Sequence, residues 1–83
     1  MDILYFAWVR EQIGVDREQL EPPADITDLR GLIGWLAGRS PGHGSALGDI
    51  ARLRAAVDQK YAALDTPIAG AREIAIFPPV TGG

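Results

Sequence analysis

The feature that most constrains this chain is one amphipathic helix that would not be stable by itself. Between Ile26 and Gly38, apolar residues recur at the spacing of one helix face. The resulting stripe comprises Ile26, Leu29, Leu32, Ile33 and Leu36. Three glycines lie opposite this stripe, and each costs about 1 kcal/mol relative to alanine in a helix interior. We therefore predict a helix from about Ile26 to Gly38, capped by Asp25, that is held in place by packing on a sheet.

Apolar segments on both sides of this helix predict the strands of the sheet. The predicted strands are Ile3–Trp8, Val15–Leu20, Arg52–Val57, a short return through Tyr61 and Ala62, and Glu73–Phe77. The first is expected to be buried on both faces and to lie beside the last in the sheet interior. The second mixes charged and apolar residues, as edge strands often do. The order predicts an α+β roll, with a mixed sheet of four to five strands packed on one main helix.

Two connecting segments are predicted to contain little regular structure. Arg10 to Ile13 is long enough for one helical turn, and Gly14 is a natural place for that turn to end. Ser40–Gly48 contains three glycines and is predicted to be a flexible connector. His43, the one histidine of the chain, is therefore expected to be exposed in a loop. It has no cysteine or second histidine to complete a metal site, so none is predicted.

Length and composition set further limits on function. The chain has 83 residues, which suffice for a single domain spanning residues 1–83. Its net charge of −3, with eight basic residues scattered among eleven acidic ones, argues against nucleic-acid binding. The absence of cysteine excludes disulfides and thiolate chemistry. Because no apolar run is long enough to span a membrane and the first residues lack a basic signal-peptide opening, we expect a cytoplasmic protein.

The C-terminal residues differ from an ordinary domain ending. After the last predicted strand come Pro78, Pro79, Val80, Thr81, Gly82 and Gly83. The two prolines favour an extended conformation, so residues 78–83 are expected to form a projecting tail. Glycine has no side chain, and such a tail can therefore enter a channel too narrow for other residues. The α-carboxylate at its tip can be activated by adenylation and then accept sulfur as a thiocarboxylate; an inert Gly-Gly ending is the alternative.

Three aromatic residues fall on predicted strands, namely Phe6, Tyr61 and Phe77. A two-layer fold covers one face of its sheet with the helix and leaves the other face open. Aromatic side chains on the open face would form an exposed apolar patch, which usually marks an interface. We therefore predict that these three residues bind a partner, with burial in the core as the alternative.

Three segments of the chain carry motifs. Residues 6–14 read Phe-Ala-Trp-Val-Arg-Glu-Gln-Ile-Gly, residues 56–61 read Ala-Val-Asp-Gln-Lys-Tyr, and residues 77–83 read Phe-Pro-Pro-Val-Thr-Gly-Gly. Together they resemble the small, sulfur-carrying subunit of molybdopterin synthase, a ubiquitin-like sulfur-carrier family. Its members tend to read Phe-Ala-x-x-Arg-Glu-x-x-Gly, Ala-Val-Asn-Gln and Phe-Pro-Pro-Val-Ser/Thr-Gly-Gly. The resemblance covers nearly the whole chain, and the C-terminal motif is its most specific part.

The resemblance implies a ubiquitin-like β-grasp fold and a role in molybdenum cofactor biosynthesis. Gly83 would be adenylated by a ubiquitin-activating-type enzyme that uses ATP, and would then become a thiocarboxylate. The tail would insert into the large synthase subunit, which binds precursor Z (cyclic pyranopterin monophosphate) and holds the catalytic residues. This chain would therefore bind no cofactor and would not be catalytic alone. Two carriers and two large subunits would form a heterotetramer.

The chain departs from the family pattern at two places. Asp58 replaces the usual asparagine of the hairpin, which a turn tolerates. Ala71-Arg72-Glu73 stands where the family has Gly-Asp-Glu, which leaves open any partner contact made by the missing acid. Two other functions also stay open. The chain could carry sulfur for another pathway, such as thiamine thiazole synthesis, or it could be an interaction module that never carries sulfur.

Overall fold

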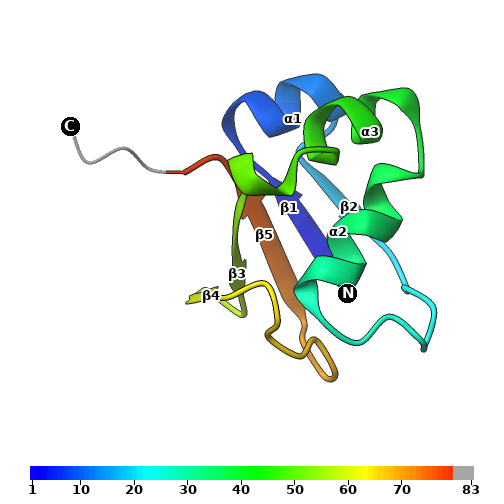
Figure 1. Ribbon diagram of the computed structural model, residues 1–83, viewed down its shortest axis with the longest axis vertical. Helices are drawn as coiled ribbons and strands as arrows, with labels where there is room; N and C mark the ends of the chain where they lie inside the picture. The colour runs from blue at the N-terminus through cyan, green and yellow to red at the C-terminus, as the bar shows by residue number, and fades with distance from the viewer. Residues whose placement is uncertain (80–83) are drawn as a thin grey trace.

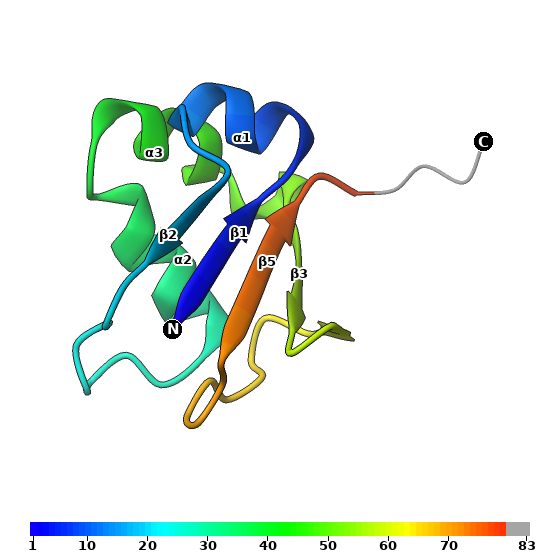
Figure 2. The same cartoon turned by 180° about the vertical axis from the view of Figure 1, so that it is seen from behind.

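A mixed five-stranded sheet is the frame of the protein in a computed structural model, which describes residues 1–79. Its elements are β1 (Asp2–Tyr5), α1 (Ala7–Ile13), β2 (Arg17–Gln19), α2 (Leu29–Ala37), α3 (Pro41–Leu47), the 3₁₀ helix η1 (Ile50–Arg52), β3 (Arg54–Val57), β4 (Lys60–Ala62) and β5 (Glu73–Phe77) (Figure 1). The helices lie on one face of the sheet, and Figure 2 shows the opposite face without any helix.

The two central strands come from the two ends of the described chain. The strand order is β2-β1-β5-β3-β4, and β1 runs parallel to β5 with Tyr5 opposite Ile76. The other neighbouring strands pair antiparallel. The structure thus confirms the mixed sheet, the central position of the first and last predicted strands, and the edge position of the second.

The core lies between the sheet and α2. The apolar stripe on α2 is buried, since Leu29, Leu32, Ile33 and Leu36 are at most 1% exposed. Facing it are buried side chains of the central strands, Ile3, Ile74 and Ile76 among them. At about 25 cal/mol per Å² of buried apolar surface, such contacts supply the main stabilisation that a glycine-containing helix lacks on its own. The prediction that this helix is held by the sheet is confirmed.

Three elements begin later than predicted, and one of them is β2, which begins at Arg17 rather than Val15. α2 begins at Leu29 and is capped by Asp28, whose Oδ1 accepts a hydrogen bond from Gly31 N–H at 2.9 Å, so Asp25 is not the cap. Asp28 itself is extended and forms a β-bridge with Pro67, and a turn precedes it, closed by the hydrogen bond from Ile26 N–H to the carbonyl oxygen of Pro23 at 3.0 Å. The third strand was predicted to start at Arg52, but η1 occupies residues 50–52, and β3 therefore starts at Arg54.

The first strand is shorter than predicted because the chain turns into α1 at Ala7, whose φ is 53°. Burial along β1 alternates, so the strand is not buried on both faces. Gly14 ends α1 in the left-handed conformation, with φ 98°, as predicted. β5 has the predicted bounds. In the β3–β4 turn, Asp58 and Gln59 both have positive φ, which tight two-residue hairpin turns require.

The segment predicted as a flexible connector is the helix α3. The Ser40 hydroxyl caps it by accepting from His43 N–H at 3.1 Å, and Pro41 occupies its first turn. Its glycines permit close packing rather than flexibility: a Cβ at Gly42 would lie 2.6 Å from the carbonyl oxygen of Gln12 in α1. The sheet is thus covered by more than the one main helix that the sequence predicted.

Candidate functional site

The helix-free face of the sheet carries the predicted partner-binding residues (Figure 2). Residues directly opposite each other in a sheet point to the same face, and neighbours along a strand point to opposite faces. Because Ile76 and its partner Ala55 are buried against the helices, Phe77 and Ala75 face away from them. The register places Leu4, Ala56, Tyr61, Ala75 and Phe77 on this face, together with Arg54, the partner of Phe77. We call the outer sheet face these five apolar and aromatic residues and Phe6, which follows β1 in an extended conformation.

An aromatic pair lies on this outer sheet face, between the end of β5 and the edge strand β4. The ring centroids of Tyr61 and Phe77 are 5.7 Å apart, with their planes at 55°. Tyr61 is 81% exposed and Phe77 is half-buried. Together with Arg54, Ala55 and Ala62 they line a shallow cavity of about 290 Å³. Tyr61 is therefore no core residue, and its role in binding a partner stays a prediction.

Phe6 does not lie on a strand, contrary to the sequence prediction. It is the residue between β1 and α1, and its side chain is 45% exposed. Its N–H donates to the carbonyl oxygen of Ile76 at 3.2 Å, which places its backbone beside the end of β5. Within residues 1–79, aromatic contacts join Tyr61 to Phe77 but do not join Phe6 to either. Phe6 thus borders the aromatic pair.

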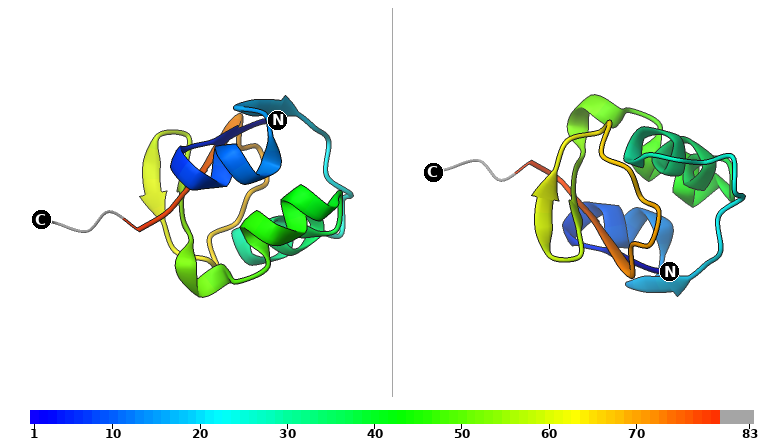
Figure 3. Two further views of the ribbon diagram at one scale, coloured as in Figure 1. Left: turned by 90° about the horizontal axis from the view of Figure 1, so that it is seen from above. Right: turned by 90° about the horizontal axis from the view of Figure 1, so that it is seen from below.

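The predicted tail starts where β5 ends. Pro78 is half-buried and Pro79 is exposed. Val80, Thr81, Gly82 and Gly83 lie outside the described residues, and the chemistry assigned to the tip stays a prediction. The root of the tail, the position where it begins, is described: Phe77 is the last residue of β5 and lies opposite Arg54 in the register. Figure 3 shows the chain leaving the sheet at the end of β5.

A polar cluster that the sequence did not predict lies on the helix-covered side. Tyr5 Oη donates to Glu18 Oε2 at 2.7 Å, and His43 Nε2 lies 2.8 Å from the same oxygen. Ser40 Oγ is 2.7 Å from His43 Nδ1. Since Glu18 is opposite Ile3 in the sheet register, it points toward the helices. We call Tyr5, Glu18, Ser40 and His43 the polar cluster.

His43 is 7% exposed, so the prediction of an exposed loop residue is wrong. Both ring nitrogens of His43 have hydrogen-bond partners: Nε2 lies against Glu18, and Nδ1 lies against the Ser40 hydroxyl. The pKa of Glu18 is raised by burial, but hydrogen bonds from Tyr5 and His43 outweigh burial and bring it below its ordinary value. Burial and the bond to Glu18 raise the pKa of Tyr5. The cluster therefore holds the ionised Glu18 carboxylate between Tyr5 and His43.

Three side chains of the polar cluster, Ser40, His43 and Glu18, are of the types found in a catalytic triad, but they are not arranged as in a triad. In a triad, the serine contacts Nε2 and the acid contacts Nδ1. Here the serine lies at Nδ1 and the acid at Nε2. The Ser40 hydroxyl also caps α3, so it is not free to attack a substrate. The cluster ties β1, β2 and α3 together, and its role is structural.

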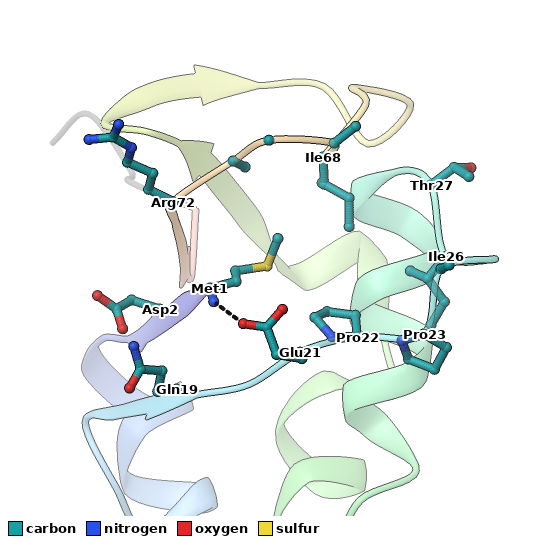
Figure 4. A pocket seen from close by; sticks show the side chains of 14 residues that line it. Met1, Asp2, Gln19, Glu21, Pro22, Pro23, Ile26, Thr27, Ile68 and Arg72 are labelled. Carbon is teal, nitrogen blue, oxygen red and sulfur yellow. Dashed lines mark hydrogen bonds and ion pairs between the residues drawn. The ribbon is translucent and has the colours of Figure 1, made fainter.

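A larger cavity, of about 710 Å³, lies at the opposite end of the sheet from Phe77 (Figure 4). Its lining includes Met1, whose amino group is 3.2 Å from Glu21 Oε1. No residue assigned a function from the sequence lines it.

Across residues 1–79 there is no cluster of three possible metal ligands. In the same part of the chain, no helix has the length and apolarity needed to cross a bilayer.

Known proteins resemble this chain along its full length. It matches the ThiS family over residues 3–83. It is 40% identical over 81 residues to the molybdopterin synthase sulfur carrier subunit of Escherichia coli (strain K12), covering 98% of this chain and 96% of that protein. The molybdopterin synthase sulfur carrier subunit of Haemophilus influenzae is 37% identical over 83 residues, covering 100% of this chain and 99% of that protein.

A solved structure shares the fold. SAMP1 from Haloferax volcanii has a TM-score of 0.76 and 28% sequence identity, covering 100% of this chain and 98% of that chain. The predicted ubiquitin-like β-grasp fold is thereby confirmed. From the family match and the two relatives, the chain belongs to the ThiS family, among proteins similar to the sulfur carrier subunits of molybdopterin synthase.

Proposed function

We propose that this chain is the sulfur carrier of a molybdopterin synthase and acts in molybdenum cofactor biosynthesis. The observation that carries the proposal is end-to-end similarity, since two relatives named for this role are 37% and 40% identical over nearly the whole chain. The shared ending from Phe77 to Gly83 supports it further, because the proposed chemistry needs an unhindered glycine at the tip.

In this proposal the reacting group is the α-carboxylate of Gly83. A carboxylate oxygen attacks the α-phosphorus of ATP on an activating enzyme, and pyrophosphate leaves as the acyl adenylate forms. A sulfur donor then displaces AMP, which leaves a thiocarboxylate on Gly83. This group delivers its sulfur to precursor Z on the large synthase subunit. The carrier needs no cofactor of its own, because ATP is used by the activating enzyme.

The outer sheet face is the proposed docking surface for the large subunit. Exposed aromatic side chains are the kind of anchor that supplies most binding energy at interfaces. Phe77 is both part of this surface and the residue before the tail, so docking here fixes where the tail begins. Reaction geometry depends on such positioning, because about 1 Å of misplacement costs roughly a hundredfold in rate. Two carriers and two large subunits in a cytoplasmic heterotetramer complete the proposal.

Intact mass spectrometry tests the carrier chemistry. After co-expression with an activating enzyme, the chain should gain the mass difference between sulfur and oxygen, located at Gly83 by fragmentation. An interaction module predicts no gain. A second experiment adds the thiocarboxylate form to a large synthase subunit and precursor Z. Conversion to the dithiolene supports the proposed pathway, whereas a thiocarboxylate that fails to convert precursor Z indicates a carrier for another pathway.

A further inference from the structure

Two arginines, Arg52 and Arg54, flank the root of the tail, and we call them the arginine pair. Arg54 is the first residue of β3 and lies opposite Phe77 in the register. Arg52 ends η1, and its guanidinium carbon lies 4.8 Å from the centre of the Trp8 ring in α1. Figures 1 and 3 show η1 and the start of α1 around the end of β5. Both arginines are exposed.

Each guanidinium is held in place by the protein itself. Arg54 Nη1 donates to the carbonyl oxygens of Leu53 at 2.7 Å and Ala51 at 3.4 Å. Among the described residues, Nε and Nη2 of Arg54 form no hydrogen bond, and this edge of the group is a fork that can bind a carboxylate through two hydrogen bonds. Arg52 is oriented by the indole face of Trp8. Because both side chains are ordered before binding, less entropy is lost when a partner engages them.

Neither arginine forms an ion pair within residues 1–79, whereas Arg17 pairs with Asp2 at 3.1 Å. The acids nearest to them in the sequence, Asp49 for Arg52 and Asp58 for Arg54, form no ion pair with either arginine in this part of the chain. The chain as a whole carries a net charge of −3. The root of the tail therefore presents two ordered positive charges on a protein of the opposite overall sign.

We propose that the arginine pair binds acidic side chains of the large synthase subunit around the opening that admits the tail. This inference rests on the proposed function, and it adds the chemistry by which the partner is recognised. Arg54 lines the same shallow cavity as Tyr61 and Phe77, so docking there brings its guanidinium against the partner, and Arg52 lies two residues before it in the chain. Complementary charges at the rim of an interface chiefly orient the partners and raise the association rate.

The test measures binding of the full-length carrier to the large synthase subunit by calorimetry at low and high salt. The test variant is Arg52→Gln/Arg54→Gln. The matched control, Arg30→Gln/Arg39→Gln, removes the same charge on and just after α2; Arg39 also lies over an indole, 5.1 Å from the centre of the Trp35 ring. Thermal melting checks that both variants are folded.

At low salt we expect the test variant to bind about tenfold more weakly than wild type, and the control to bind like wild type. In about 1 M salt the difference should shrink, because the screening length falls to about 3 Å. The inference is overturned if the test variant binds like wild type, if the control weakens equally, or if only binding to the activating enzyme weakens. Failure of the wild-type chain to bind the large subunit would instead reject the proposed function, and the inference with it.

Discussion

The polar cluster and the outer sheet face belong to opposite faces of one sheet and have opposite chemistry. In the polar cluster, four polar side chains are buried or half-buried, and each has its hydrogen-bond partner within the described chain. On the outer sheet face, Phe6 and Tyr61 are exposed, Tyr61 to 81%, and the remaining side chains are half-buried. The polar groups of one face find their partners within the protein, whereas the other presents exposed aromatic side chains of the kind that usually mark an interface.

This difference assigns folding and association to separate faces. A change in the polar cluster should alter the free energy of unfolding and leave binding by the folded molecules unchanged. A change on the outer sheet face or in the tail should do the reverse. The separation is open to direct experimental challenge, and the largest effect is expected at the tip of the tail.

Deleting Gly83 should abolish thiocarboxylate formation while the melting temperature stays the same. The shortened chain ends in a similar carboxylate, but about 3.3 Å short of its former reach. Misplacement of about 1 Å already costs roughly a hundredfold in rate. No core residue of the described chain lies beyond Ile76, so stability should not change. Intact mass and thermal melting measure the two effects. Adding a residue after Gly83 should fail equally, and normal thiocarboxylate formation by either variant would reject the mechanism.

Replacing Glu18 by alanine should lower the free energy of unfolding by about 2–4 kcal/mol. The change leaves the Tyr5 hydroxyl and His43 Nε2 without their shared acceptor in a mostly buried site. Denaturant titration measures the loss, and Glu11→Ala, at an exposed position of α1, is the control. Binding to the large subunit below the unfolding transition should be unaffected. Weaker binding by a fully folded Glu18→Ala chain would break the separation of the two faces.

Phe77→Ala should weaken binding to the large subunit by about 2 kcal/mol, or roughly thirtyfold. Because Phe77 is half-buried, its loss should lower stability by less than the roughly 3–5 kcal/mol expected for a fully buried aromatic residue. Calorimetry and denaturant titration on the same preparation compare the two quantities. If the variant is destabilised yet binds the large subunit as tightly as wild type, the role of Phe77 is to stabilise the fold and not to bind the partner.

Lowering the pH should remove the contribution of the polar cluster to the free energy of unfolding. The pKa of Glu18 is held below its ordinary value of 4.5, so its ionised form contributes stability at neutral pH. That contribution should disappear as the pH falls below 4.5 through the pKa of the folded state. Urea titrations of wild type and Glu18→Gln across this range measure the effect. The two proteins should converge in stability toward low pH, and parallel pH profiles would show that Glu18 has no such role.

The smallest change is expected for Asp58→Asn, which restores the residue usual in the family hairpin. Asp58 Oδ1 accepts hydrogen bonds from the N–H groups of Arg72 at 2.9 Å and Glu73 at 3.0 Å. Asparagine keeps an oxygen in that position and tolerates the positive φ of 48°. Stability should therefore change by no more than about 0.5 kcal/mol by thermal melting. Asp58→Ala removes both bonds and should be measurably worse; equal stability of the two variants would show that the bonds contribute little.

Patterns that depend on local sequence predicted the fold well. The bounds of β5, the end of α1 at Gly14 and the turn after β3 follow from alternation and from residues that tolerate positive φ. The helix α3 was missed because its glycines suggest flexibility. One signal could have revealed this helix: Ser40 is followed by Pro41, and this pair is a common helix start. The need for glycine at position 42 comes from α1, which no local pattern contains.

The candidate site was predictable only in part, because its residues are brought together by the sheet register. The sequence singled out Tyr61 and Phe77, and the structure joins them. It did not single out Leu4, Ala56 or Ala75, which complete the outer sheet face only once β1, β3 and β5 are aligned. His43 was misplaced for the same reason, since its partner Glu18 is 25 residues away in the chain.

The parallel pairing of β1 with β5 also sets the order in which the chain can fold. Asp2 pairs with Glu73, so the central contact of the sheet must close nearly the whole described chain. Contacts this distant in sequence form late, because the entropy of loop closure is lost before they stabilise anything. During synthesis the sheet cannot be completed until Phe77 has been made. A chain that stops short of β5 would lack this central strand and stay open to proteolysis.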